Sequence, residues 1–68
     1  MDKAILLSDL LQLMSTHTEI VMRDENYTLL FVGTKYDENI HKYEYKLVLE
    51  LDSWSPTKLL VRIVNENY

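Results

Sequence analysis

The side chains that could act as nucleophiles or general bases are few and scattered along the chain. The 68 residues include no cysteine and only two histidines. No serine stands in the G-x-S-x-G turn that exposes a catalytic serine in hydrolases. Ser53 and Ser55 flank Trp54 next to Pro56, a composition typical of a turn. Because no nucleophile, base and oxyanion donors occur together, we expect that the protein is not an enzyme.

One pair of side chains has the spacing of metal ligands. Glu38 and His41 stand at i and i+3, which places two ligands on one face of a helix. A structural metal site needs about four ligands, and no neighbouring residue completes the set. The lone Gly33 cannot form the glycine-rich loop that cradles a phosphate. We therefore expect neither a metal nor another cofactor.

Aromatic side chains in predicted turns give the best indication that the chain binds another molecule. Tyr36 and Trp54 stand in polar surroundings, and tyrosine and tryptophan are favoured anchors of protein interfaces. Large residues also close the rims of a small core, so both interpretations stay open. Acidic pairs in the predicted turns would add charge to such a contact. The predicted partner-binding residues are Tyr36, Trp54, Asp24, Glu25, Asp37 and Glu38.

Three basic residues could share the polar face of a predicted sheet. Lys46, Lys58 and Arg62, with abundant tyrosines, suggest a platform for single-stranded nucleic acid. Glu44 and Glu50 are expected on the same face, where opposite charges form ordinary cross-strand pairs. The net charge of −4 also opposes contacts to phosphates. A single-stranded nucleic-acid binder is therefore a disfavoured alternative.

The length and the N-terminal sequence limit the organisation of the chain. We expect one domain spanning 1–68, whose core gives marginal stability because a short chain buries only about 60% of its unfolded surface. Without disulfides, a homodimer is a reasonable source of additional stability. The N-terminus has no signal-peptide pattern, and no apolar stretch approaches the roughly 20 residues of a membrane helix. We expect a cytoplasmic protein with no membrane contact.

The periodicity of apolar residues predicts one helix followed by strands. Leu7, Leu10, Leu11 and Met14 have the spacing of one helical face within 4–14, although Ala4–Leu6 could equally be a short strand. In the loop 35–43, Asp37 could cap a helical turn that directs Ile40 and Tyr43 inward. The predicted strands are 18–24, 27–34, 44–52 and 58–64.

The order of these elements predicts an α+β fold in two layers. Short connections favour antiparallel neighbours, so we expect an N-terminal helix packed on a four-stranded antiparallel β-meander. Strand 27–34 is apolar on both faces, which favours a central position or burial under two layers. Strand 44–52 alternates most regularly, with Tyr45, Leu47, Leu49 and Leu51 on one face.

Four segments resemble short proteins of Gram-positive phages and mobile elements. They read SDLLQLM, TEIVMRDENYTLLFVGT, YKLVLEL and LLVRIV, and the resemblance covers residues 7–64. These proteins share a DLLxxL helix, a TEVxIRD hairpin with an LFxG strand, and closing strands. Tyr27 stands where the pattern has a turn glycine. The motifs are structural, and the resemblance implies no activity for any residue here.

The resemblance implies a genetic setting in which tiny acidic proteins often inhibit host machinery, as anti-CRISPR proteins do. We therefore expect a small acidic protein-interaction module, encoded by a phage or mobile element, that binds and modulates a host protein. The alternative from the residues themselves is a structural homodimer or a small subunit of an assembly.

Overall fold

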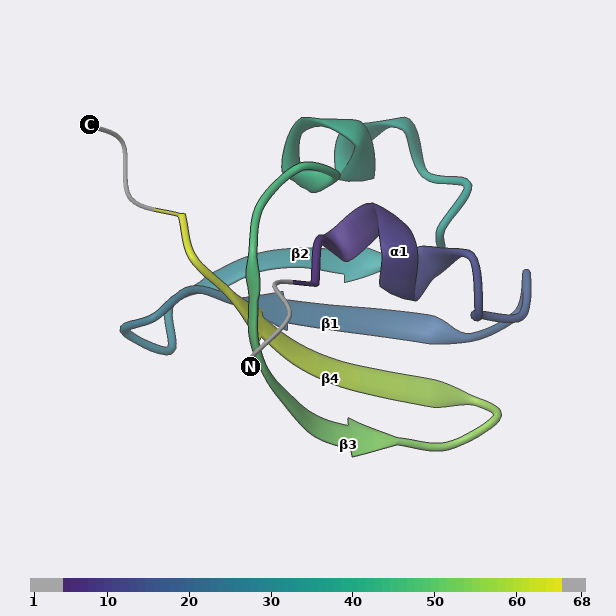
Figure 1. Ribbon diagram of the computed structural model, residues 1–68. Coiled ribbons are helices and arrows are strands. Elements are labelled where there is room, and N and C mark those ends of the chain that lie inside the picture. The colour runs from purple at the N-terminus through teal and green to yellow at the C-terminus, as the bar shows by residue number, and fades with distance from the viewer. Residues whose placement is uncertain (1–4, 66–68) are drawn as a thin grey trace.

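The chain folds as a four-stranded sheet with both helical segments on one of its faces (Figure 1). A computed structural model describes residues 5–65. The strand order is β2-β1-β4-β3. In chain order the elements are α1 (Leu7–Leu11), β1 (Glu19–Arg23), β2 (Leu29–Gly33), the 3-10 helix η1 (Glu38–Tyr43), β3 (Val48–Trp54) and β4 (Lys58–Ile63). The prediction of a mixed α+β fold is confirmed.

Helix α1 is shorter than the predicted range 4–14, but its buried face is the predicted one. Leu7, Leu10, Leu11 and Met14 are all buried. The Asp9 carboxylate accepts a hydrogen bond from the Leu6 amide at the start of the helix, the position that the helix dipole favours for an acid. Burial of four apolar side chains therefore fixes a segment that is too short to be stable alone.

The segment 5–8 first pairs with the chain around the start of β3 and then begins helix α1. Leu6 forms an antiparallel bridge with Leu47, and the Val48 amide donates to the Ile5 carbonyl oxygen at 2.8 Å. Leu6 is therefore extended, and the helix begins at Leu7. The sequence left open whether Ala4–Leu6 is helix or strand. The first residue of this range, Ala4, lies outside the described residues.

The predicted helical turn in the loop 35–43 is confirmed as η1. The Asp37 side chain is the N-cap and accepts a hydrogen bond from the Asn39 amide at 3.0 Å. Ile40 and Tyr43 are buried against the sheet, as predicted. Helix η1 therefore gives the long connection between β2 and β3 its own anchor in the core.

The prediction of an antiparallel meander is wrong, because β1 and β4 are parallel neighbours. The pairs β1–β2 and β3–β4 are antiparallel hairpins, and the sheet joins them through β1 and β4. The connection from β2 to β3 includes η1 and crosses over the helical face of the sheet (Figure 1). A crossover of a dozen or more residues permits parallel pairing, so the rule for short connections does not apply here.

Strand β2 lies at an edge of the sheet and not in its centre. Phe31 is buried, whereas Leu29 and Val32 are about half exposed. Within residues 5–65 the helices cover one face of the sheet, so the apolar residues on the other face of β2 stay at the surface. An apolar pattern on both faces of a strand thus did not mean burial on both.

The side chains of β3 do not alternate regularly between the two faces of the sheet, contrary to the prediction for 44–52. Tyr45, Leu47, Leu49 and Leu51 are all exposed, and Val48 is the β3 residue that packs against the core. The register of β3 against β4 shifts twice, between Val48 and Glu50 and again between Leu51 and Ser53. Such bulges change which face each side chain takes, and the position of β3 at the edge leaves its leucines beyond the helices.

The core lies between α1, η1 and the two central strands. Its buried sheet residues come from β1, β2 and β4. They are Ile20, Met22, Phe31, Leu59, Val61 and Ile63. The centre of the fold is therefore the parallel pair β1–β4, and β3 extends past it.

Thr18 is a buried polar residue, and we expect its replacement by valine to destabilise the fold. Its hydroxyl donates to the Pro56 carbonyl oxygen at 2.9 Å and joins the start of β1 to the β3–β4 turn. Thr18→Val keeps the shape but removes this hydrogen bond, so the free energy of unfolding should fall by about 1 kcal/mol. Urea denaturation followed by circular dichroism measures this change in the free energy of unfolding. Thr16→Val, at an exposed position, is the control and should have little effect.

Candidate protein-binding surface

A hollow in the surface lies between the segment that follows α1 and the β3–β4 turn. It is an open pocket of about 480 Å³ with Trp54 in its wall. The pocket is lined by Leu13, Ser15, Thr18, Trp54, Ser55 and Pro56. Trp54 is 50% exposed and Leu13 is 66% exposed. Two large apolar side chains therefore meet water beside an open pocket.

The leucines of β3 continue this apolar surface along the edge of the sheet. Leu51 pairs with Val61 and Trp54 pairs with Leu59, and side chains of paired residues lie on the same face of a sheet. Because Val61 and Leu59 are in the core, Leu51 and Trp54 lie on the helical side of β3. Leu49, the extra residue of the first bulge, is 48% exposed and Leu51 is 41% exposed. We call Leu13, Leu49, Leu51 and Trp54 the β3 apolar surface.

The outer face of the same strand carries a charged cluster. The Arg62 guanidinium forms an ion pair with Glu50, and its Nε lies 3.8 Å from Asp52 Oδ2. The ring of Tyr27 stacks on Arg62, with 4.4 Å between the guanidinium carbon and the ring centroid. The hydrogen bond from Arg62, and then its positive charge, hold the pKa of the Glu50 carboxyl below its usual value. β3 is therefore apolar toward the helices and acidic toward the outer face.

Tyr27, at the place of the pattern's turn glycine, has a left-handed backbone. Its φ is +66°, a conformation that costs a non-glycine residue roughly 1 kcal/mol or more. The Asp24 carboxylate accepts hydrogen bonds from the Asn26 and Thr28 amides and holds the turn around it. The β1–β2 turn thus supports the backbone that brings the Tyr27 ring over Arg62.

The lowered pKa of Glu50 predicts a loss of stability in acid. A carboxylate with a lowered pKa in the folded state contributes stability above its ordinary pKa of 4.5 and loses it as pH falls through the folded pKa. Glu50→Gln should therefore be less stable than the wild type at pH 7, and the difference should shrink as pH falls below 4.5. Urea denaturation at a series of pH values checks this. A difference that is independent of pH would mean that Glu50 acts by packing and not by charge.

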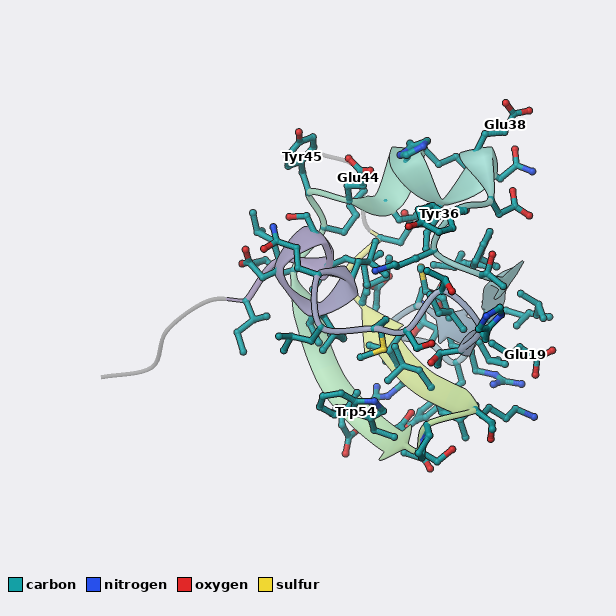
Figure 2. All side chains as sticks on the ribbon, turned by 90° about the vertical axis from the view of Figure 1, so that its right-hand side faces the viewer. Glu19, Tyr36, Glu38, Glu44, Tyr45 and Trp54 are labelled. Atoms are coloured by element: carbon teal, nitrogen blue, oxygen red, sulfur yellow. The ribbon has the colours of Figure 1, made fainter. Side chains whose placement is uncertain are left out.

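The six predicted partner-binding residues do not form one surface. Figure 2 shows Trp54 beside β3, whereas Tyr36 and Glu38 lie near η1, away from it. Tyr36 is 72% exposed and lines a second groove, between α1 and η1. Of the acids, Asp24 and Asp37 accept hydrogen bonds within their own turns, and Glu25 accepts one from the Asn65 amide at 2.9 Å. Their contact with a partner stays a prediction, but three of the four already have a structural role.

Sequence reasoning selected Trp54 but missed the residues around it. Leu13 stands just after α1, and its exposure follows from its place outside the face formed by Leu10 and Met14. Leu49 and Leu51 gave a misleading signal, because regular alternation is typical of a core face. No local pattern in the sequence indicates the two bulges that change this.

Two of the three basic residues of the nucleic-acid hypothesis have acidic neighbours, and the third, Lys46, precedes the first residue of β3. Lys58 Nζ lies 3.6 Å from Glu19 Oε1 across β1 and β4. Arg62 lies between Glu50 and Asp52. These are the ordinary cross-strand pairs described above, and they leave less positive charge for a phosphate.

The residues described, 5–65, contain no cluster of three or more His, Cys, Asp or Glu side chains placed to hold a metal. His41 pairs with Glu44 and not with Glu38, the residue at metal-ligand spacing. None of the helices within the same residues has the length and apolar character needed to cross a membrane.

Comparison of the chain with protein-family models, with curated proteins and with solved structures gives no match.

Proposed function

We propose that this chain is a small protein-interaction module that binds and modulates another protein through the β3 apolar surface. The observation that carries the proposal is the exposure of Trp54 and two leucines on an edge strand, beside an open pocket. Tryptophan is enriched among the residues that anchor protein interfaces.

The size of this surface supports a binding role. Its exposed apolar area is on the order of 400 Å², within the range of the largest patch on ordinary monomers, which is often functional. Burying it would contribute about 10 kcal/mol before the costs of association. Those costs are estimated at about 4–15 kcal/mol. Apolar contact alone therefore gives weak binding, and further contacts from the same strand would be needed for a stable complex.

The resemblance to short proteins of phages and mobile elements gives this module a biological setting. In that setting the partner is a host protein, and binding inhibits it in the manner of an anti-CRISPR protein. The net charge of −4 over 68 residues is too small for a mimic of DNA. We therefore favour an inhibitor that blocks a pocket or an interface, acting without catalysis of its own and with no cofactor.

Affinity capture from host lysate, read by mass spectrometry, tests the proposal. The wild type should retain one dominant partner in a fixed ratio, and Trp54→Ala with Leu13→Ser should lose it. Tyr36→Ala is the matched control, because it removes an exposed aromatic ring on a different surface. All variants are first compared by circular dichroism, so that loss of the partner is not confused with loss of the fold.

Two results would contradict the proposal. If the double variant keeps its partner and Tyr36→Ala loses it, binding occurs at the groove between α1 and η1. If the bait recovers only itself and light scattering gives a dimer, the surface joins two copies, and the chain is a structural homodimer or assembly subunit.

A further inference from the structure

We propose that β3 accepts an extended segment of a partner protein as an added strand, and that this segment alternates apolar with basic side chains. The inference rests on the proposed function and names the kind of partner. It concerns the part of β3 from Leu49 to Trp54, which we call the open edge.

The first argument is the backbone of β3. This strand is at the edge of the sheet and pairs with β4 on one side. On its other side, the segment 5–8 already pairs with 44–48, through Leu7 N to the Lys46 oxygen at 3.0 Å and Val48 N to the Ile5 oxygen. Among residues 5–65, no strand continues this pairing beyond Val48. An unpaired strand edge is a template for another strand.

The second argument is the chemistry of the two faces. On the helical side the open edge presents Leu51 and Trp54, which are half exposed. On the outer side it presents Glu50 and Asp52, which share the single guanidinium of Arg62. Two carboxylates against one cation leave a negative charge. Because side chains alternate along a strand, an added strand would place apolar residues against Leu51 and Trp54 and basic residues near the carboxylates.

The carboxylates of the open edge also favour a partner protein, and not a second copy of this chain, as the source of the added strand. Antiparallel pairing of two β3 strands around Leu51 would bring Glu50 of each copy opposite Asp52 of the other. Like charges directly opposite each other destabilise a sheet. The two bulges interrupt pairing with any added strand, so the charge of the edge is what distinguishes a basic partner from a second copy. A basic strand meets no such repulsion.

The test uses a peptide of eight residues that alternates lysine with valine and is blocked at both ends. Trp54 is the only tryptophan in the chain, so its fluorescence reports binding at the open edge. Amide chemical shifts identify which residues are perturbed. We expect a saturable shift of Trp54 emission, with perturbed amides at 49–54. A peptide alternating glutamate with valine should bind about tenfold more weakly, since each cross-strand charge pair contributes a factor of a few.

Two further comparisons separate strand addition from general attraction. The Lys–Val peptide with all interior amides N-methylated should lose binding, because it keeps the charge but cannot donate backbone hydrogen bonds. The protein variant Glu50→Gln with Asp52→Asn should bind the unmodified peptide about tenfold more weakly. Glu38→Gln with Glu44→Gln removes the same charge near η1 and should bind like the wild type.

Several results would overturn the inference. Equal binding of the N-methylated peptide would mean simple charge attraction, and perturbed amides confined to β2 or η1 would place the contact elsewhere. Concentration-dependent association without peptide, mapped to 49–54, would make the occupant a second copy. No saturable response at millimolar peptide would exclude strand addition. The proposed function would survive that last result if Trp54→Ala with Leu13→Ser still lost a partner, so the two failures are distinguishable.

Discussion

Replacing Leu59 by alanine should lower the free energy of unfolding by about 2–5 kcal/mol, whereas the same change at Leu49 should cost less than about 1 kcal/mol. Leu59 is fully buried on β4, where it pairs with Ile20 of β1 and Trp54 of β3. Its truncation leaves a cavity at the centre of the core. Leu49 is about half exposed on the edge strand, so its removal leaves no cavity.

Urea denaturation followed by circular dichroism measures both changes. A domain of this size has only a few kcal/mol of stability, so Leu59→Ala is measured together with a milder variant. Ile20→Val, at the neighbouring core position on β1, removes one methylene and should cost about 0.5–1.5 kcal/mol. If Leu49→Ala costs as much as Leu59→Ala, the regular alternation of 44–52 is a core face and the exposed leucines of β3 are misplaced.

Ile40→Ala should cost about 2–5 kcal/mol, because Ile40 anchors η1 in the core. Ile40 is fully buried although it belongs to the connection between two edge strands. Without this side chain the connection loses one of its two core contacts, the other being Tyr43, and the amides of 38–43 should exchange with solvent faster than those of β1 and β4. Hydrogen exchange with denaturation measures both effects.

Tyr36→Ala is the control for Ile40→Ala in the same connection. Its ring is largely exposed, so both stability and exchange should stay close to the wild type. Equal losses for the two variants would mean that the whole connection acts as one packed unit, and that the burial of Ile40 is not the cause.

The sequence predicted those elements well that depend on interactions between residues close together in the chain. The spacing of Leu7, Leu10, Leu11 and Met14 predicted the buried face of α1. Asp37 predicted η1, because a side-chain cap acts on amides two or three residues away. These interactions are short in sequence, so a single chain is enough to see them.

The candidate surface could be predicted only in part. Trp54 was selected because it stands in a predicted polar turn; in the structure it is the last residue of β3 and is half exposed. Tyr36 is exposed as well but lies in a separate groove. Leu49 and Leu51 were predicted on one face of a regularly alternating strand, and they are surface residues because β3 lies at the edge of the sheet with two bulges.

The sequence by itself determined the α+β class, the buried face of α1 and the absence of a cysteine site. These follow from side-chain type and from periods of 3.6 and 2 residues, which are local properties. The tertiary structure alone decided that β1 and β4 are parallel, that β2 and β3 are edges, and that the β3 leucines face water. The strand order depends on how the hairpins β1–β2 and β3–β4 pack against the two helices. This packing is set by contacts between residues that are far apart in the chain.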